Sequence, residues 1–143
     1  MKWYEFDPDR LIFEYETMTN VIPLAAACHL NDGQLAWEVE VKDIPPGVEA
    51  HPLRVLIIYP DCFPGKPPRI CPVEPQLPKE HVGHKWHRYT NGDICLVNPV
   101  NWRICYTASD CVEKLADWYF NYLCLANGLI ESFPEQGRAQ LGN

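Results

Sequence analysis

The sequence predicts a single α+β domain, in which a helix, a four-stranded antiparallel meander, a long irregular loop and a long helix follow one another. Two segments of helical periodicity stand at the two ends of the chain, and apolar runs separated by turn residues lie between them. The 143 residues, 47% of them apolar, suffice for one hydrophobic core. We find no internal repeat and no linker, so the predicted domain spans residues 1–143.

The first helix is predicted over about residues 6–20. Asp7 is a good N-cap, and Pro8 suits the first helical position. The residues expected on its apolar face are spaced three or four apart: Leu11, Tyr15 and Met18. The residues expected on its solvent face are acidic: Asp9, Glu14 and Glu16.

Four strands are expected to follow, over residues 21–30, 35–41, 52–59 and 69–73. The segment Asn31-Asp32-Gly33 predicts a hairpin turn between the first two strands. Apolar and acidic residues alternate in the second strand, in the order Trp37, Glu38, Val39, Glu40 and Val41. Such alternation is typical of an antiparallel strand with one solvated face.

The second half of the chain begins with a stiff segment and ends with the longest helix. Residues 59–70 include five prolines or glycines, so this segment is extended and cannot be a helix or a central strand. The long helix is predicted from Thr107 to a C-cap at Asn127-Gly128. The polar tail over residues 131–143 is expected to fray.

The candidate functional residues lie in residues 84–96, where Cys95 follows a turn. His84, His87 and Asn91 precede it, and Asn91 with the next glycine forms the strongest turn signal of the chain, since both accept positive φ. A thiol on a braced loop near imidazoles suits a nucleophile or a metal ligand. The alternative is a buried, unreactive cysteine, because free cysteine is among the most buried residue types.

Composition restricts the possible partners and the compartment. The formal net charge of −7 argues against a nucleic-acid-binding surface. No apolar run approaches the roughly 20 residues that span a bilayer, and the first residues lack the apolar region of a signal peptide. The seven cysteines are odd in number and form no Cys-x-x-Cys pair, which predicts reduced thiols in a cytoplasm.

Three segments in register resemble motifs of the ubiquitin-conjugating enzymes. Residues 59–70, with the pattern Tyr-Pro-x-x-Phe-Pro-x-Lys-Pro-Pro-x-Ile, resemble the proline-rich signature that follows the third strand of that family. Residues 91–96, Asn-Gly-Asp-Ile-Cys-Leu, resemble the segment that carries its thioester cysteine. Trp102, followed five residues later by Thr107, is similar to the family's tryptophan and to the start of its post-cysteine helix. The resemblance covers about residues 52–123 and implies a UBC-like fold.

The resemblance also implies an enzyme. Cys95 would accept the activated C-terminus of a donor protein as a thioester and transfer it to an amine or a thiol. The implied partners are an activating (adenylating) enzyme or its donor protein, and neither a cofactor nor a metal is expected. The candidate catalytic residues are Cys95, His87, His84 and Asn91.

Some positions depart from the eukaryotic family. The family's asparagine eight positions before the cysteine is replaced by His87, which can donate a hydrogen bond or accept a proton. The proline after the family's tryptophan is replaced by Arg103, the first helix is acidic where eukaryotic members are basic, and little sequence follows the long helix. This pattern is similar to bacterial relatives in antiphage operons, which act on a cGAS-like nucleotidyltransferase. Ubiquitin's own activating enzyme is therefore not the expected partner.

Three other interpretations remain open from the sequence. A non-catalytic binding module could share the same fold. A zinc site could use three or four of the evenly spaced histidines and the cysteine, namely His81, His84, His87 and Cys95. A Cys–His hydrolase would use Cys95 and His87 to cleave a thioester or isopeptide with water.

Overall fold

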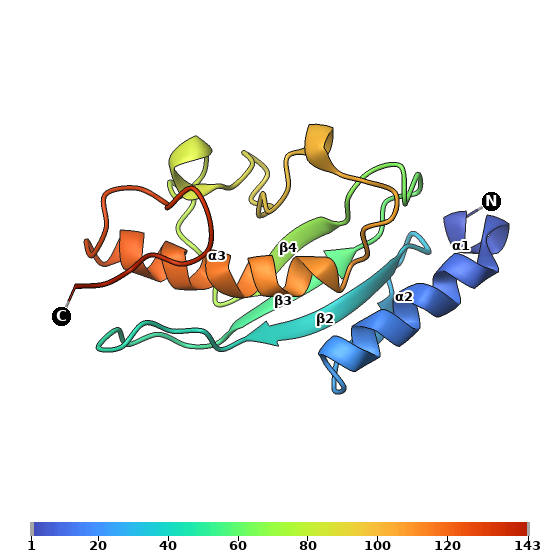
Figure 1. Ribbon diagram of the computed structural model, residues 1–143, viewed down its shortest axis with the longest axis horizontal. Helices are drawn as coiled ribbons and strands as arrows, with labels where there is room; N and C mark the ends of the chain where they lie inside the picture. The colour runs from blue at the N-terminus through green and yellow to red at the C-terminus, as the bar shows by residue number, and fades with distance from the viewer. Residues whose placement is uncertain (1, 143) are drawn as a thin grey trace.

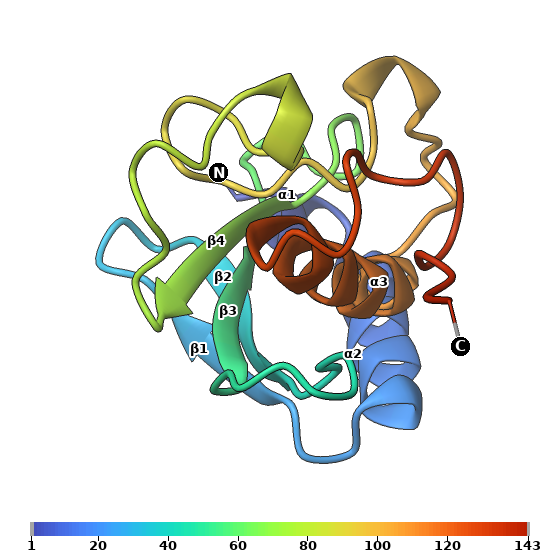
Figure 2. The same ribbon diagram turned by 90° about the vertical axis from the view of Figure 1, so that its left-hand side faces the viewer.

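The structure is a computed structural model that describes residues 2–142. Its antiparallel sheet contains four strands in sequential order, β1 (Ala26–His29), β2 (Leu35–Val41), β3 (Leu53–Ile58) and β4 (Arg69–Glu74). Figures 1 and 2 show helices α2 (Pro8–Val21) and α3 (Asp110–Ala126) on the same face of this sheet. The remaining helices are short: α1 (Trp3–Phe6) and the 3₁₀-helices η1 (His84–Trp86) and η2 (Pro99–Asn101). The predicted α+β class, with a four-stranded antiparallel sheet and helices at both ends, is confirmed.

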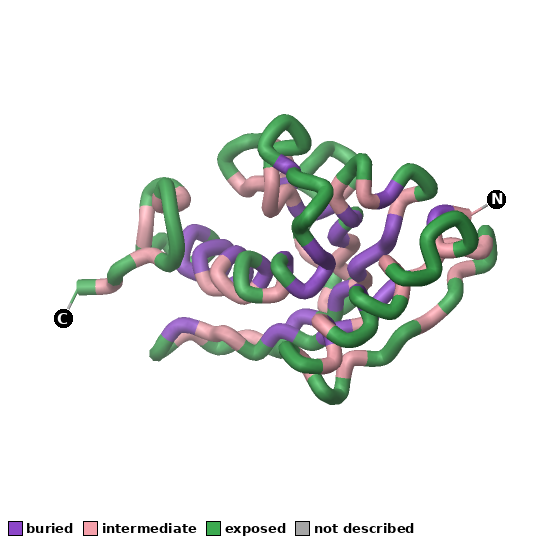
Figure 3. The backbone as a smooth tube through the Cα atoms, turned by 45° about the vertical axis from the view of Figure 1, so that its right-hand side comes forward, coloured by how far each residue is buried: buried purple, intermediate pink, exposed green. Residues whose placement is uncertain are grey.

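The hydrophobic core lies between the sheet and α3. The predicted alternation in β2 is confirmed, because Trp37, Val39 and Val41 are buried while Glu40 is exposed. The α3 residues that pack on this face are also buried: Leu115, Trp118, Tyr119 and Tyr122. Figure 3 shows this burial along α3 and along the strands that face it. Within residues 2–142, no helix is long and apolar enough to cross a membrane.

The predicted limits of the helices and strands agree with the structure to within a few residues, except at the first strand. Asp7 caps α2 as expected, since its carboxylate accepts a hydrogen bond from the Arg10 amide at 3.1 Å. The helix continues to Val21, so β1 begins only at Ala26 and is shorter than the predicted strand over 21–30. An apolar run of this length has no periodicity that separates the end of a helix from the start of a strand.

The prediction that Glu14 faces solvent is wrong. Its side chain is 1% exposed and accepts hydrogen bonds at 2.8 Å from the Tyr59 hydroxyl and from the Ala108 amide. The Arg10 guanidinium pairs with its second oxygen at 3.1 Å. Burial raises the pKa of Glu14, and these three donors act in the opposite direction. The buried carboxylate therefore connects α2 to the residue that follows β3 and to the segment that leads into α3.

Glu14→Ala is expected to lower the free energy of unfolding by about 3 kcal/mol, because it leaves buried donors of Tyr59 and Ala108 without an acceptor. Urea denaturation of the variant and the parent protein measures this difference. Glu16→Ala, on the solvent side of the same helix, is the control and is expected to change stability by less than about 0.5 kcal/mol. Equal losses in the two variants would contradict a structural role for the Glu14 network.

The C-terminal segment makes contacts with α3 that the sequence did not indicate. The buried Asn121 of α3 accepts a hydrogen bond from the Ala139 amide at 2.7 Å. Arg138 forms an ion pair with Asp117 at 2.7 Å. Figure 1 shows the segment folding back beside the C-terminal half of α3. A buried asparagine needs hydrogen-bond partners, and the polar tail supplies them.

Candidate active site

Cys95 lies in the loop between β4 and α3 and is held by its backbone on two sides. The amide of the preceding residue, Ile94, donates to the Ile70 carbonyl of β4 at 2.7 Å. The amide of Cys95 itself donates to the His87 carbonyl at 2.8 Å. Ile94 is buried in the core, whereas Cys95 is only half-buried. An anchored backbone therefore presents a partly accessible thiol.

The turn before Cys95 forms, with one difference from the prediction. Gly92 adopts the expected positive φ of 97°, but His87 is the one non-glycine residue with positive φ in residues 2–142, so Asn91 does not share this conformation. The side-chain oxygen of Asn91 accepts a hydrogen bond from the Asp93 amide at 2.9 Å. Asn91 thus shapes the turn through Asp93, to which its side chain forms two hydrogen bonds.

His87 is joined to Cys95 across this turn by the backbone hydrogen bond described above. Its backbone is left-handed, with φ 49° and ψ 46°, where it ends η1, and non-glycine residues in this conformation are concentrated at functional sites. The imidazole stacks on Phe133 of the C-terminal segment, with ring centroids 4.5 Å apart, and lies 5.8 Å from the His84 ring. Burial, and secondarily the charge of His84, lowers the pKa of His87. The ring is therefore neutral near pH 7, with one donor and one acceptor nitrogen.

Phe133→Ala is expected to raise the pKa of His87, because the phenyl ring covers the imidazole and burial is the main cause of the lowered pKa. An NMR titration that follows the His87 ring protons measures the change. Leu129→Ala, which removes an exposed side chain from the same part of the chain, is the control and is expected to leave the titration unchanged. An unaltered His87 pKa in Phe133→Ala would contradict this explanation.

The other two histidines of this loop have different surroundings. His84 is exposed on η1, near the His87 ring. His81 instead packs against α3, where its Nδ1 lies 2.7 Å from the Tyr122 hydroxyl and its ring stacks on Trp86 at 3.9 Å. Within the described part of the chain, no group of three or more His, Cys, Asp or Glu side chains is placed to hold a metal ion. The structure therefore does not bring His81 together with the other proposed zinc ligands.

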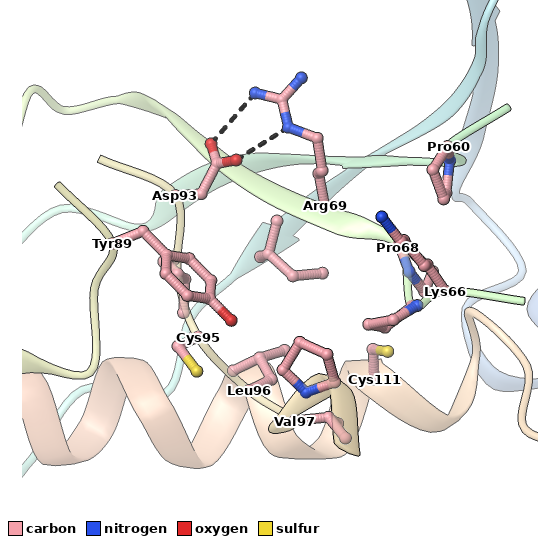
Figure 4. Close-up of a pocket in the computed structure, with 14 residues that line it drawn as sticks. Pro60, Lys66, Pro68, Arg69, Tyr89, Asp93, Cys95, Leu96, Val97 and Cys111 are labelled. Carbon is pink, nitrogen blue, oxygen red and sulfur yellow. Dashed lines mark hydrogen bonds and ion pairs between the residues drawn. The ribbon is translucent and has the colours of Figure 1, made fainter. Parts of the chain in front are cut away.

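Tyr89 is a site residue that sequence reasoning missed. Figure 4 shows its hydroxyl directed toward the region of the Cys95 sulfur. The neighbouring Cys95 is the largest cause that raises the pKa of Tyr89 to about 12. The phenol therefore remains protonated at neutral pH and can donate to a thiolate. No periodicity or motif in the sequence marked this residue, because its proximity depends on the turn.

Arg88 was also missed, and it braces the loop from within. Its guanidinium, in a side chain that is 8% exposed, donates to the Gly92 carbonyl at 3.1 Å and to the His81 carbonyl at 2.8 Å. These bonds join the turn before Cys95 to the start of the histidine-bearing loop. Arginine is usually exposed, so its position in the sequence did not indicate burial.

Cys95 lies between two hollows of different chemistry. The first has a volume of about 360 Å³ and lies between the proline-rich segment over residues 60–70 and the segment over residues 93–99 (Figure 4). The second has a volume of about 650 Å³, and its polar lining includes His84, His87 and Thr90. Cys95 and Tyr89 line both hollows.

The other cysteines differ from Cys95 in their surroundings. Cys62 and Cys105 are exposed and line neither hollow. Cys111, near the start of α3, lines the first hollow but is buried, and burial raises its pKa to about 12. A buried thiol with a raised pKa is a poor nucleophile at neutral pH.

Comparison with known proteins identifies no relative: no family model, curated protein or solved structure matches this chain. Any functional proposal for this chain therefore rests on its fold and its site. They define an α+β protein with a half-buried cysteine on a braced loop, an imidazole that lines the same hollow and a phenol beside the cysteine. This set of groups suits covalent catalysis by a thiolate.

Proposed function

We propose that the protein is a ubiquitin-conjugating-enzyme-like acyltransferase. In this proposal Cys95 accepts the activated C-terminus of a donor protein as a thioester and transfers it to an amine or a thiol. The observation that carries the proposal is the position of Cys95, whose anchored backbone presents a thiol at the junction of two hollows. A carrier cysteine needs this access, because donor and acceptor must both reach the same sulfur.

The groups around Cys95 suit both steps of this reaction. In loading, the Cys95 thiolate attacks the activated carbonyl, a carbon–sulfur bond forms, and the activating group leaves with its bonding electrons. The protonated Tyr89 hydroxyl can donate to the sulfur and hold it in place. In discharge, a neutral His87 ring can donate a hydrogen bond to the oxyanion or accept the proton of the attacking amine.

Contacts between the resembling motifs also support the proposal. The indole nitrogen of Trp102 donates to the Pro64 carbonyl of the proline-rich segment at 2.8 Å, and its ring lies 6.3 Å from that of Phe63. Two segments that resemble the same family, although 38 residues apart in sequence, thus pack together. The order of helix, meander, loop and helix agrees with the UBC-like fold that we propose.

We further propose a bacterial setting, in which the reaction belongs to antiphage defence and takes place in a reducing cytoplasm. The reaction would act on a cGAS-like nucleotidyltransferase, and an adenylating enzyme would activate the donor protein. This part of the proposal rests on the replacement of the family's asparagine by His87 and on the acidic first helix, where Asp9 and Glu16 are exposed. An acidic helix face favours a basic partner surface.

A second candidate function is hydrolysis of a thioester or isopeptide by Cys95 and His87. The observation that favours it is the polar hollow, which both residues line and which has room for water. A hydrolase would release a free carboxylate instead of a conjugate. The third interpretation, a non-catalytic binding module, requires no adduct on Cys95 at all.

Mass spectrometry of the protein, purified together with the products of its neighbouring genes, tests these candidates. If the proposal is correct, a C-terminal peptide of a donor protein will be joined to the Cys95 peptide, and hydroxylamine will release it. The hydrolase would be favoured if the donor were found with a free C-terminus and no conjugate of the donor with an acceptor were detected. A co-purified donor without any Cys95 adduct, even after addition of ATP, would contradict acyl transfer.

A further inference from the structure

The two hollows beside Cys95 differ in lining: the smaller one is mainly apolar, and the larger one is polar. Its walls are formed mainly by prolines and aliphatic side chains: Pro67, Pro68, Ile70, Ile94, Leu96 and Val97. Of the charged residues at its edge, Arg69 and Asp93 form an ion pair with each other at 2.8 Å, and Lys66 is exposed (Figure 4). An uncharged, apolar group therefore gains most from entering this cavity.

The cavity is also directly accessible from the reactive sulfur, since Cys95 is part of its lining. In a thioester on Cys95, the carbonyl carbon is bonded to the sulfur, and the next atom is the Cα of the donor's last residue. The side chain of that residue must therefore lie within a few bonds of the sulfur. Of the two hollows that meet at Cys95, the apolar one suits an apolar side chain.

We propose that this cavity binds the side chain of the donor's C-terminal residue, and that this residue is large and apolar. The inference rests on the proposed acyl transfer and adds to it the class of donor that Cys95 accepts. The volume of about 360 Å³ is near the lower end of the range for ligand sites, about 300–1,000 Å³. It holds one leucine-sized or aromatic side chain and is too small for a folded segment.

The acceptor amine is assigned to the other hollow by the same reasoning. A lysine acceptor arrives as an ammonium ion, and burying an unpaired charge among prolines and aliphatic groups is costly. The larger hollow offers the rings of His84 and His87, which can accept a proton from that ammonium. The two sides of Cys95 thus serve different substrates, which avoids competition between donor and acceptor for one site.

Small thioester probes test the inference without knowledge of the natural donor. We would use acetyl-glycyl-Xaa thioesters of mercaptoethanesulfonate, with Gly, Ala, Leu, Phe or Asp as Xaa. In the exchange, the Cys95 sulfur forms a bond to the carbonyl carbon, the bond to mercaptoethanesulfonate breaks, and that thiolate takes up the proton lost by Cys95. Tandem mass spectrometry gives the loading rates of Cys95 and of the exposed Cys105 in the same molecule.

Dividing the loading rate of Cys95 by that of Cys105 corrects for differences in intrinsic reactivity between the probes. For Leu and Phe probes, the Cys95/Cys105 ratio is expected to exceed the ratio for Gly by at least about tenfold, the discrimination typical of an apolar pocket. For Asp, the ratio should stay well below the ratios for Leu and Phe, because the lining is mainly apolar. Equal Cys95/Cys105 loading ratios for all probes would overturn the inference. A side-chain preference seen only for the amine acceptor in the discharge step, and not for the probe in the loading step, would also overturn it.

The Val97→Phe variant tests the role of the cavity directly, because Val97 lines it and the larger phenylalanine side chain would fill part of its volume. It is expected to bring the Leu/Gly preference close to one while the Gly probe still loads. Val100→Phe is the matched control, because Val100 is 83% exposed, outside the cavity, and should keep the preference. An unchanged preference in a folded Val97→Phe protein, judged by its thermal melt, would also overturn the inference. Failure of every probe to load Cys95 in the parent protein would instead contradict the proposed acyl transfer.

Discussion

Replacement of Cys95 by serine is expected to convert an adduct that reducing agent removes into one that reducing agent leaves intact. The reason is chemical: a thiol displaces the sulfur of a thioester readily, whereas the oxygen ester formed by serine resists this exchange. Cys95→Ala is expected to keep the fold, because the side chain is only half-buried, and to lose the adduct completely. Gel electrophoresis with and without reducing agent distinguishes the parent protein from the two variants: the parent has a reductant-sensitive adduct, Cys95→Ser a resistant one and Cys95→Ala none.

Cys105→Ser is the matched control for this experiment. Cys105 is exposed and lines neither hollow, so its replacement should leave the Cys95 adduct unchanged. A reductant-sensitive adduct that persists in Cys95→Ala would place the reactive thiol elsewhere, with Cys105 as the first alternative. Cys111 is a less suitable alternative, since burial raises its pKa to about 12.

Removal of the His87 side chain is expected to slow discharge of the thioester to amines by about 10²-fold, the usual cost of losing one oxyanion donor. Loading of Cys95 should be nearly unaffected. His87→Asn is expected to recover part of the discharge rate, because an amide can donate the same hydrogen bond but cannot act as a base. Single-turnover discharge to lysine, followed separately from loading, measures both effects.

The backbone of His87 requires a particular choice of variants. Its left-handed conformation is costly for alanine but is tolerated by glycine and asparagine. His87→Ala therefore changes both the ring and the backbone, whereas His87→Gly removes the ring and retains the conformation. His84→Ala, a change farther from Cys95 in sequence, is expected to have a smaller effect. Unchanged discharge in His87→Gly would show that the ring is not needed, and lost loading with intact discharge would indicate a docking role.

Local sequence patterns predicted most of the fold. Three correctly predicted features depend only on near neighbours in the chain: the alternation of β2, the helix cap at Asp7 and the positive φ of Gly92. A short stretch of sequence contains the information for each of them. The same kind of information located Cys95 after its turn. It did not decide on which side of α2 Glu14 lies, because an acidic residue within a helical period is usually solvated.

The remaining features depend on segments that are far apart in the chain. The Ile70 carbonyl of β4 anchors the segment of Cys95, and Phe133 covers the His87 ring. The apolar cavity likewise exists only where residues 60–70 face residues 93–99. Sequence by itself thus determined the fold class and the candidate thiol, because both follow from local periodicity and local turns. Only the tertiary structure decided what surrounds that thiol, because contacts across many residues form when the whole core packs.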